Sequence, residues 1–164
     1  MKVEREQYAQ LPGYPKDTFS VKKLLTLNQL VSQNYWLAPD KMDGAEFVLS
    51  LGCERTVNWV ELVNTHNGWH RDRATREFKV FISQSLNLPW QEVLHTTLED
   101  SRQHPDPLPV QTFRFKNSRA KFIKYDQISK YGQGGGLQYF AVKHKKQKQG
   151  DISVGATKKF RKRM

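Results

Sequence analysis

The most restrictive feature of this sequence is a series of short segments in which apolar and polar residues alternate. Segments 46–51, 78–83 and 111–115 each place an apolar residue at every second position. A period of two puts alternate side chains on opposite faces, as in a strand with one buried face. Segment 57–63 is apolar on both faces, as expected for a strand inside a packed sheet. Further short strands are expected at 90–94, 120–126 and 137–142.

Seven or eight such strands, with no long helical repeat between them, predict an all-β fold. The architecture that fits is an antiparallel jelly-roll β-sandwich of about eight strands. Residues 24–142 form the expected sandwich, with one short helix at 22–31 and a proline-containing loop at 100–110. Residues 1–23 are polar and contain Pro12, Gly13 and Pro15, which predicts an irregular leader. The core is expected to include Phe47, Leu49, Trp59, Leu62, Phe78, Val80, Ile82, Phe113, Phe122, Ile123, Tyr139 and Val142, and Trp36 and Trp90 are expected to be structural.

The positive charge of the chain is concentrated at its C-terminal end. The formal net charge is +11, and residues 143–164 hold nine Lys and Arg against one acid, Asp151. This basic tail is predicted either to be a solvated terminus, to contact RNA, DNA, an acidic protein surface or an anionic membrane, or to act as a nuclear-import signal. Its cations are Lys143, Lys145, Lys146, Lys148, Lys158, Lys159, Arg161, Lys162 and Arg163.

The sequence has none of the motifs that indicate catalysis. It contains no Gly-x-Ser-x-Gly nucleophile turn, and the glycines at 134–136 are not followed by the Lys-Ser/Thr of a phosphate loop. Those three glycines are expected to allow a tight turn with positive φ before the last strand. The chain is therefore predicted not to be an enzyme.

Metal and disulfide chemistry are similarly limited. Cys53 is the single cysteine, which excludes an intrachain disulfide and a cysteine-ligated metal site. His66 and His70 are four residues apart, but Asn67 and Gly68 between them favour a turn, so both are expected to be solvent-facing loop residues. No cofactor is predicted; a structural calcium ion held by Asp40 and Asp43 is the weak alternative.

The apolar segments are too short to span a membrane, and the first residues lack the apolar stretch of a secretory signal. These features and the absence of disulfides favour an intracellular protein, cytoplasmic or nuclear, unless the chain is part of a longer secreted protein.

Three stretches, in this order, resemble the discoidin (coagulation-factor C-type) domain of the galactose-binding-like superfamily. They are NYWLAPDKMDGAEFVLSLG, VNWVELVNTHNGWHRDRATREFKVFIS and RAKFIKYDQISKYGQGGGLQYFAV, and the resemblance covers about residues 24–142. The sequence lacks the cysteine pair that joins the two ends of this domain in secreted members. The resemblance implies a β-sandwich whose ligands bind loops gathered at one end.

Carried onto this sequence, those loops are 32–35, 39–44 and 64–73. The third contains Trp69 beside His and Arg residues, which suits a sugar ring stacked on the indole, an anionic group held by Arg, or a protein interface. Asp72 and Arg73 are expected to pair and fix the exit of this loop. The predicted ligand-binding residues are Trp69, His70, His66, Arg71, Asn67, Tyr35 and Lys41.

Two functions follow from these observations. The first is a non-enzymatic binding module of discoidin type that recognises a glycan, an anionic ligand or a protein partner through these loops. The alternative is an architectural subunit of a larger assembly, whose basic tail contacts RNA or an acidic protein surface.

Overall fold

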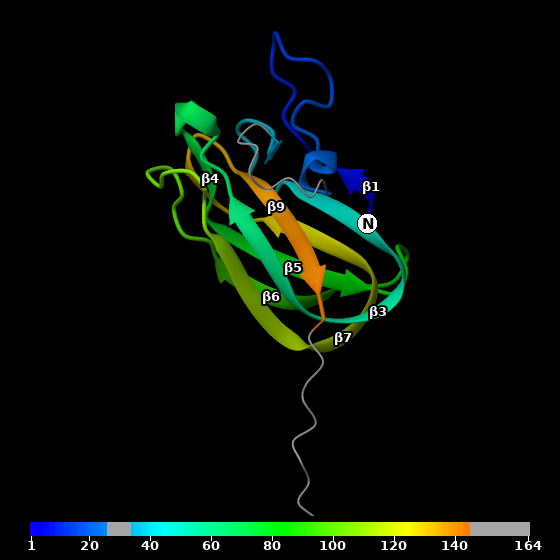
Figure 1. The fold of residues 1–164 in the computed structure, drawn as a ribbon. Helices are drawn as coiled ribbons and strands as arrows, with labels where there is room; N and C mark the ends of the chain where they lie inside the picture. The colour runs from blue at the N-terminus through cyan, green and yellow to red at the C-terminus, as the bar shows by residue number, and fades with distance from the viewer. Residues whose placement is uncertain (26–33, 145–164) are drawn as a thin grey trace, which may run out of the picture.

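The computed structural model describes residues 1–25 and 34–144, which form an antiparallel β-sandwich with no α-helix in this part of the chain (Figure 1). The all-β prediction is confirmed. None of the helical turns in these residues is long and apolar enough to cross a lipid bilayer. The elements are β1 (Lys2–Glu6), the 3-10 turn η1 (Val21–Leu25), β2 (Trp36–Leu37), β3 (Glu46–Asn64), the 3-10 turn η2 (Gly68–His70), β4 (Arg73–Thr75), β5 (Glu77–Ser83), β6 (Gln91–Thr97), β7 (Val110–Gln127), β8 (Lys130–Gly132) and β9 (Gly136–Lys143).

Two long strands, β3 and β7, run through both layers of the sandwich. The sequence analysis divided each into two strands, because polar residues interrupt the apolar pattern near their middles. In the structure, residues 46–50 of β3 pair with residues 122–126 of β7, and residues 55–63 pair with residues 110–120. Gly52, with φ of 86°, lies in the irregular stretch between these two paired regions. The polar interruptions therefore mark bends within continuous strands.

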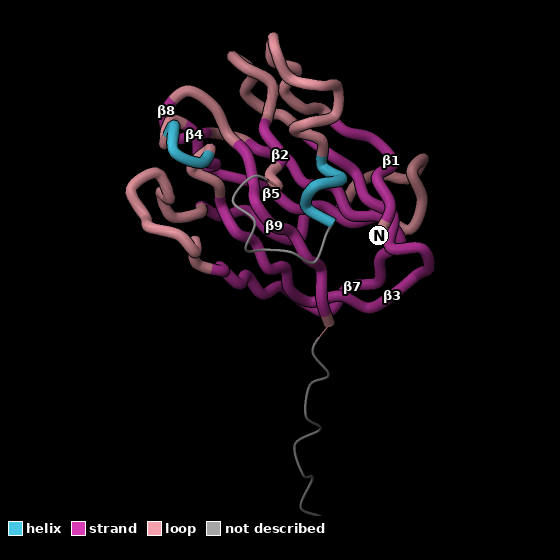
Figure 2. Tube along the Cα trace, turned by 45° about the horizontal axis from the view of Figure 1, so that its top comes forward, coloured by secondary structure: helices cyan, strands magenta, loops and turns pink. Residues whose placement is uncertain are grey.

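The partners of β3 and β7 define the two layers. One layer contains β1, the first half of β3, the second half of β7, and then β5 and β6. The other contains β2, β9, the second half of β3 and the first half of β7. A separate pair, β4 and β8, lies near η2 at one end of the sandwich (Figure 2).

The N-terminal segment is part of the fold, so the prediction of an irregular leader is wrong for residues 2–6. Strand β1 pairs with β3, and the Ala9 N–H donates to the carbonyl oxygen of Leu37 at 2.8 Å. The carboxylate of Glu6 accepts hydrogen bonds from the Ser20 hydroxyl and the Val21 N–H, which closes the segment into a loop. β1 is short and mostly charged, so only its partner strand identifies it as a strand.

The core between the layers is rich in aromatic rings. Phe47 and Tyr125 stack at 4.9 Å between ring centroids, and the fully buried Trp36 meets Phe47 edge-on at 5.3 Å. The indole Nε1 of Trp36 donates to the carbonyl of Gln7 at 2.7 Å, which confirms its expected structural role. Most of the predicted core residues are buried or packed against the core, but Trp59 is half-buried and alternates with the buried Val60 and Leu62, so it points outward.

The three consecutive glycines are needed for close packing, whereas the sequence analysis expected them to supply positive φ. None of them is among the glycines with positive φ. A Cβ on Gly135 would lie 1.7 Å from Oε1 of Gln127, and one on Gly136 would lie 2.4 Å from the carbonyl oxygen of Trp36. The backbone before β9 thus passes too close to its neighbours for any side chain.

Candidate functional site

A cleft that bears predicted site residues lies at the end of the sandwich where the N-terminal segment meets the loop between β3 and β4. Its volume is about 610 Å³. Five of the predicted ligand-binding residues line it: Tyr35, Asn67, Trp69, His70 and Arg71. Sequence analysis missed the walls contributed by Leu11, Tyr14, Thr18 and Phe19 of the N-terminal segment and by Asp106 of the loop between β6 and β7.

Trp69 is the most exposed large apolar side chain among the described residues. Its exposed fraction is 85%, and its ring lies 4.2 Å from the His70 ring at an angle of 25°. The histidine therefore covers one side of the indole. An exposed indole is a large apolar surface to leave in water, so its placement at a cleft indicates a binding function.

The turn η2 that presents Trp69 is fixed by its backbone and by hydrogen bonds. Asn67, Gly68 and Arg71 adopt left-handed conformations, with φ of 60°, 59° and 52°. The Asn67 N–H donates to Oγ1 of Thr65 at 3.0 Å, and its Nδ2 donates to Oδ1 of Asp72 at 2.8 Å. Asparagine and glycine tolerate this conformation better than other residues, so the sequence favours this turn locally.

Arg71 joins this turn to the loop between β6 and β7. Its Nη1 donates to the carbonyl oxygens of Arg102 at 3.1 Å and His104 at 2.9 Å. Arg71 is one of the predicted ligand-binding residues. It lines the cleft, but this nitrogen serves to hold two loops of the rim together.

His66 is buried, contrary to the prediction of a solvent-facing loop histidine. It is 1% exposed, and its Nε2 lies 3.0 Å from Oδ1 of Asp106. Asp106 lines the cleft, and this contact with the buried His66 holds its carboxylate in place. The sequence did not show it, because Asp106 is distant in the chain and follows a proline-containing stretch that carries no strand pattern. Among the described residues, no group of three or more His, Cys, Asp or Glu side chains could hold a metal ion.

The carboxylates considered for calcium both face cations. Asp40 forms an ion pair with the buried Arg73, and Asp43 lies 3.9 Å from Nζ of Lys130. The expected pair of Asp72 with Arg73 is replaced by this Asp40–Arg73 pair, which ties loop 39–44 to the start of β4. Lys41 is exposed but is not among the residues that line the cleft.

An aromatic wall faces η2 across the cleft. Tyr14 and Phe19 lie 5.2 Å apart, and Phe19 stacks on Tyr35 at 6.0 Å. Burial raises the pKa of Tyr35, so its hydroxyl remains a hydrogen-bond donor at neutral pH. The cleft therefore offers apolar ring faces together with hydroxyl and carboxylate groups.

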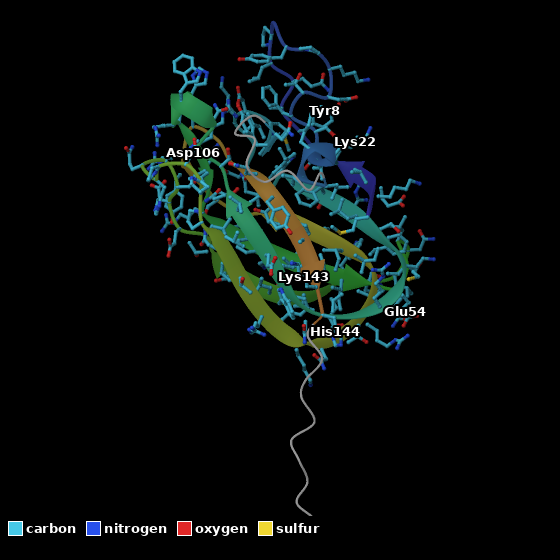
Figure 3. The ribbon with its side chains drawn as sticks, viewed as in Figure 1. Tyr8, Lys22, Glu54, Asp106, Lys143 and His144 are labelled. Carbon is cyan, nitrogen blue, oxygen red and sulfur yellow. The ribbon has the colours of Figure 1, made fainter. Side chains whose placement is uncertain are left out.

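The basic tail begins within the fold, at the end distant from the cleft. Lys143 is the first residue of the predicted tail and also the last residue of β9. Its Nζ lies 2.8 Å from Oε2 of Glu61. Figure 3 shows Lys143 and His144 far from Asp106, which marks the cleft. Lys145, Lys146, Lys148, Lys158, Lys159, Arg161, Lys162 and Arg163 lie outside the described residues, so their partners remain a prediction.

No protein-family model and no curated protein matches the sequence. Solved structures match the fold. The C-terminal domain of a chitobiase from Bacteroides fragilis has a TM-score of 0.68 at 13% identity, covering 87% of this chain and 91% of that domain. A carbohydrate-binding module from Clostridium perfringens, solved with GalNAc-β-1,3-galactose, has a TM-score of 0.61 at 13% identity over 74% of this chain and 81% of the module.

A third structure is a chitosan-binding module from Paenibacillus sp., solved with chitotriose. Its TM-score is 0.58 at 16% identity, covering 85% of this chain and 94% of the module. The chain thus has the β-sandwich fold seen in family 32 carbohydrate-binding modules. The expected fold is confirmed; at these identities the match defines the fold alone.

Proposed function

We propose that this protein is a non-catalytic glycan-binding module and that the cleft beside η2 is its binding site. The observation that carries the proposal is the 85% exposure of Trp69 on a turn fixed by three left-handed residues at the rim of the cleft. A rigid exposed indole loses little entropy when a flat apolar ligand face stacks on it. Related folds with bound GalNAc-β-1,3-galactose and chitotriose support saccharide as the ligand class.

The cleft offers a sugar both a ring face for stacking and partners for its hydroxyl groups. The sugar would place its C–H face on the indole side not covered by His70. Tyr35 and Asp106 lie among the lining residues and would take hydroxyl groups as donor and acceptor. The contact with His66 holds the Asp106 side chain in place before the ligand binds. The hydrogen bond from Arg71 to the Arg102 carbonyl likewise fixes the rim of the cleft.

The charges of the cleft favour an uncharged or weakly charged saccharide over a polyanion. Arg73 is paired with Asp40, and Nη1 of Arg71 is engaged by two carbonyl groups. The cleft is lined by two cations, Arg71 and Arg73, and by two carboxylates, Asp72 and Asp106, so it has no excess positive charge to attract sulfate or phosphate groups.

Isothermal titration calorimetry with chitotriose and GalNAc-β-1,3-galactose tests this function. We expect at least one of them to bind the full chain, Trp69→Ala to weaken that binding at least tenfold, and Trp69→Phe to retain part of it. Leu88→Ala is the matched control, because Leu88 is 53% exposed but lies outside the cleft. Saccharide binding that survives Trp69→Ala would place the site elsewhere, and binding of neither saccharide would contradict the proposed ligand class.

A further inference from the structure

Strand β7 carries a row of basic side chains that the cleft does not use. Between Val110 and Tyr125 the strand has five Lys and Arg residues and no Asp or Glu. The row consists of Arg114, Lys116, Arg119, Lys121 and Lys124.

Because β7 passes from one layer to the other, Arg114 and Lys116 lie on the outer face of the layer that contains β9, and Lys124 lies on the outer face of the layer that contains β5, so the row follows β7 around the edge of the sandwich. Between them, Phe115 packs against the core, and Ala120 and Ile123 are buried in it. Arg114, Lys116, Arg119 and Lys121 are exposed and Lys124 is half-buried. At about 3.3 Å per residue, the row from Arg114 to Lys124 extends over about 33 Å measured along the bent strand.

Aromatic rings lie beside the row at both of its ends. The guanidinium carbon of Arg114 lies 5.4 Å from the centre of the Trp59 ring, and Nζ of Lys121 lies 5.8 Å from the Phe122 ring. Nζ of Lys124 lies 4.3 Å from the Phe81 ring and 5.5 Å from Trp90. Contacts of this kind hold the cations near the surface without neutralising them.

The row accounts for the excess positive charge of the described residues. Residues 145–164 contain eight of the 27 basic residues and one of the 16 acidic residues, and residues 26–33 contain none. The described residues thus have nineteen basic and fifteen acidic side chains, an excess of four, whereas the row alone contributes five. Without the row, this part of the protein would be close to neutral.

Acidic neighbours neutralise little of this charge. Arg119 pairs with Glu54, but no carboxylate of the described residues forms an ion pair with Lys116, Lys121 or Lys124.

The start of the basic tail lies next to the row. Trp59 on β3 is the strand partner of Arg114 on β7 on one side and of Lys143 on β9 on the other. The end of β9, where the basic tail begins, therefore adjoins one end of the row.

We propose that this row is a docking surface for single-stranded nucleic acid. Phosphates spaced along the strand would meet the three lysines without an ion-pair partner, and unpaired bases would stack on the half-buried indoles Trp59 and Trp90. An aromatic base stacks on an indole over a larger flat area than the C–H face of a sugar does, so the indoles at the two ends of the row favour nucleic acid over a sulfated polysaccharide. This surface is distinct from the cleft, and the inference does not depend on the proposed glycan site.

Fluorescence anisotropy with a labelled 20-nucleotide oligouridine and the full chain tests the charge of the row. In Lys116→Gln/Lys121→Gln/Lys124→Gln, we expect an affinity loss of about 100-fold at 0.1 M salt and a salt-dependence slope lower by about 2. The matched control, Lys16→Gln/Lys22→Gln/Lys41→Gln, removes the same charge from exposed residues outside the row and should change the affinity less than threefold. Equal losses in both triple variants would overturn the proposal, because they would show a response to net charge alone.

A second comparison tests the aromatic component. Trp59→Ala should weaken oligouridine binding about tenfold, and Trp59→Phe should retain most of it, with circular dichroism confirming the fold of each variant. A heparin fragment should lose affinity in the lysine variant but not in Trp59→Ala. If oligouridine also ignores Trp59→Ala, the row is a site for sulfated polymers and the proposal is wrong. It is equally wrong if the lysine variant aggregates but binds normally, because the cations would then only protect the strand from self-association.

Discussion

The cleft beside η2 and the basic row on β7 differ in whether their charged side chains have partners of opposite charge. In the cleft, Arg73 is paired with Asp40, and His66 contacts Asp106. On the row, Lys121 and Lys124 lie over aromatic rings and have no ion-pair partner among the described residues. A region that cancels its own charge can recognise shape and hydroxyl groups, whereas a region that keeps its charge attracts polyanions from solution.

The largest expected difference between the two regions is their response to salt. Between 0.05 and 0.5 M NaCl, oligouridine affinity should fall about 100-fold if three lysines contact phosphates, because counterions are released on binding. Saccharide affinity at the cleft should change less than twofold. Anisotropy titrations and calorimetry across this salt range would measure both. A shared salt dependence would mean that one surface binds both ligands.

The next largest effect concerns the ion pairs of the two regions. Asp40→Ala leaves the guanidinium of Arg73, whose side chain is 7% exposed, without its carboxylate, and should lower the free energy of unfolding by about 2 kcal/mol. Glu54→Ala is the matched change on the row. Because the side chain of Arg119 is 65% exposed, it should cost less than about 0.5 kcal/mol. Urea unfolding would compare them, and similar losses would contradict the contrast drawn above.

The rigidity of the η2 turn gives a smaller effect that is confined to the cleft. Asn67→Ala forces alanine to a φ of 60° and removes the hydrogen bond to Asp72, so it should destabilise the fold by about 1–2 kcal/mol and weaken saccharide binding. Asn67→Gly keeps the backbone conformation and should recover most of the stability. Oligouridine binding should be the same in both variants; a change there would show that the cleft and the row are coupled.

The smallest effect concerns Glu61, the acid beside Trp59. The hydrogen bond from Lys143 lowers the pKa of Glu61. This pair therefore stabilises the fold above the unfolded-state pKa near 4.5, and that contribution is lost as the pH falls through the lower folded-state pKa. Glu61→Gln should show a slightly smaller drop in Tm between pH 7 and pH 3 than the unmodified chain.

The Glu61→Gln substitution should also raise oligouridine affinity about twofold at pH 7, because it removes one acid beside the row. Lower affinity would argue against the location of the docking surface.

Local patterns in the sequence predicted much of the fold. Alternation at Phe47 and Leu49, and again at Phe78 and Val80, identified strands and the faces that they bury. The pattern failed at Trp59, which is apolar yet points outward, because both faces of that segment are apolar. The length of β3 also escaped prediction, because the polar residues after Ser50 occur at a bend rather than at a strand end.

The candidate site was predicted in part. Trp69 was expected at the ligand-facing end because the resemblance places it in loop 64–73, and its side chain is 85% exposed. Tyr14 and Phe19 were missed because prolines and glycine obscure any pattern in the N-terminal segment, and His66 was wrongly placed in solvent. The buried position of His66 depends on Asp106, 40 residues further along the chain.

The sequence by itself determined which segments are strands, which residues face the core and where charge accumulates, since these properties depend on neighbours within a few positions. Only the tertiary structure decided that the N-terminal segment, η2 and the Asp106 loop enclose one cleft, and that cations of β7 lie beside one indole from β3 and another from the residue before β6. Those arrangements follow from pairing between strands far apart in the chain, and the same local patterns are compatible with many such pairings.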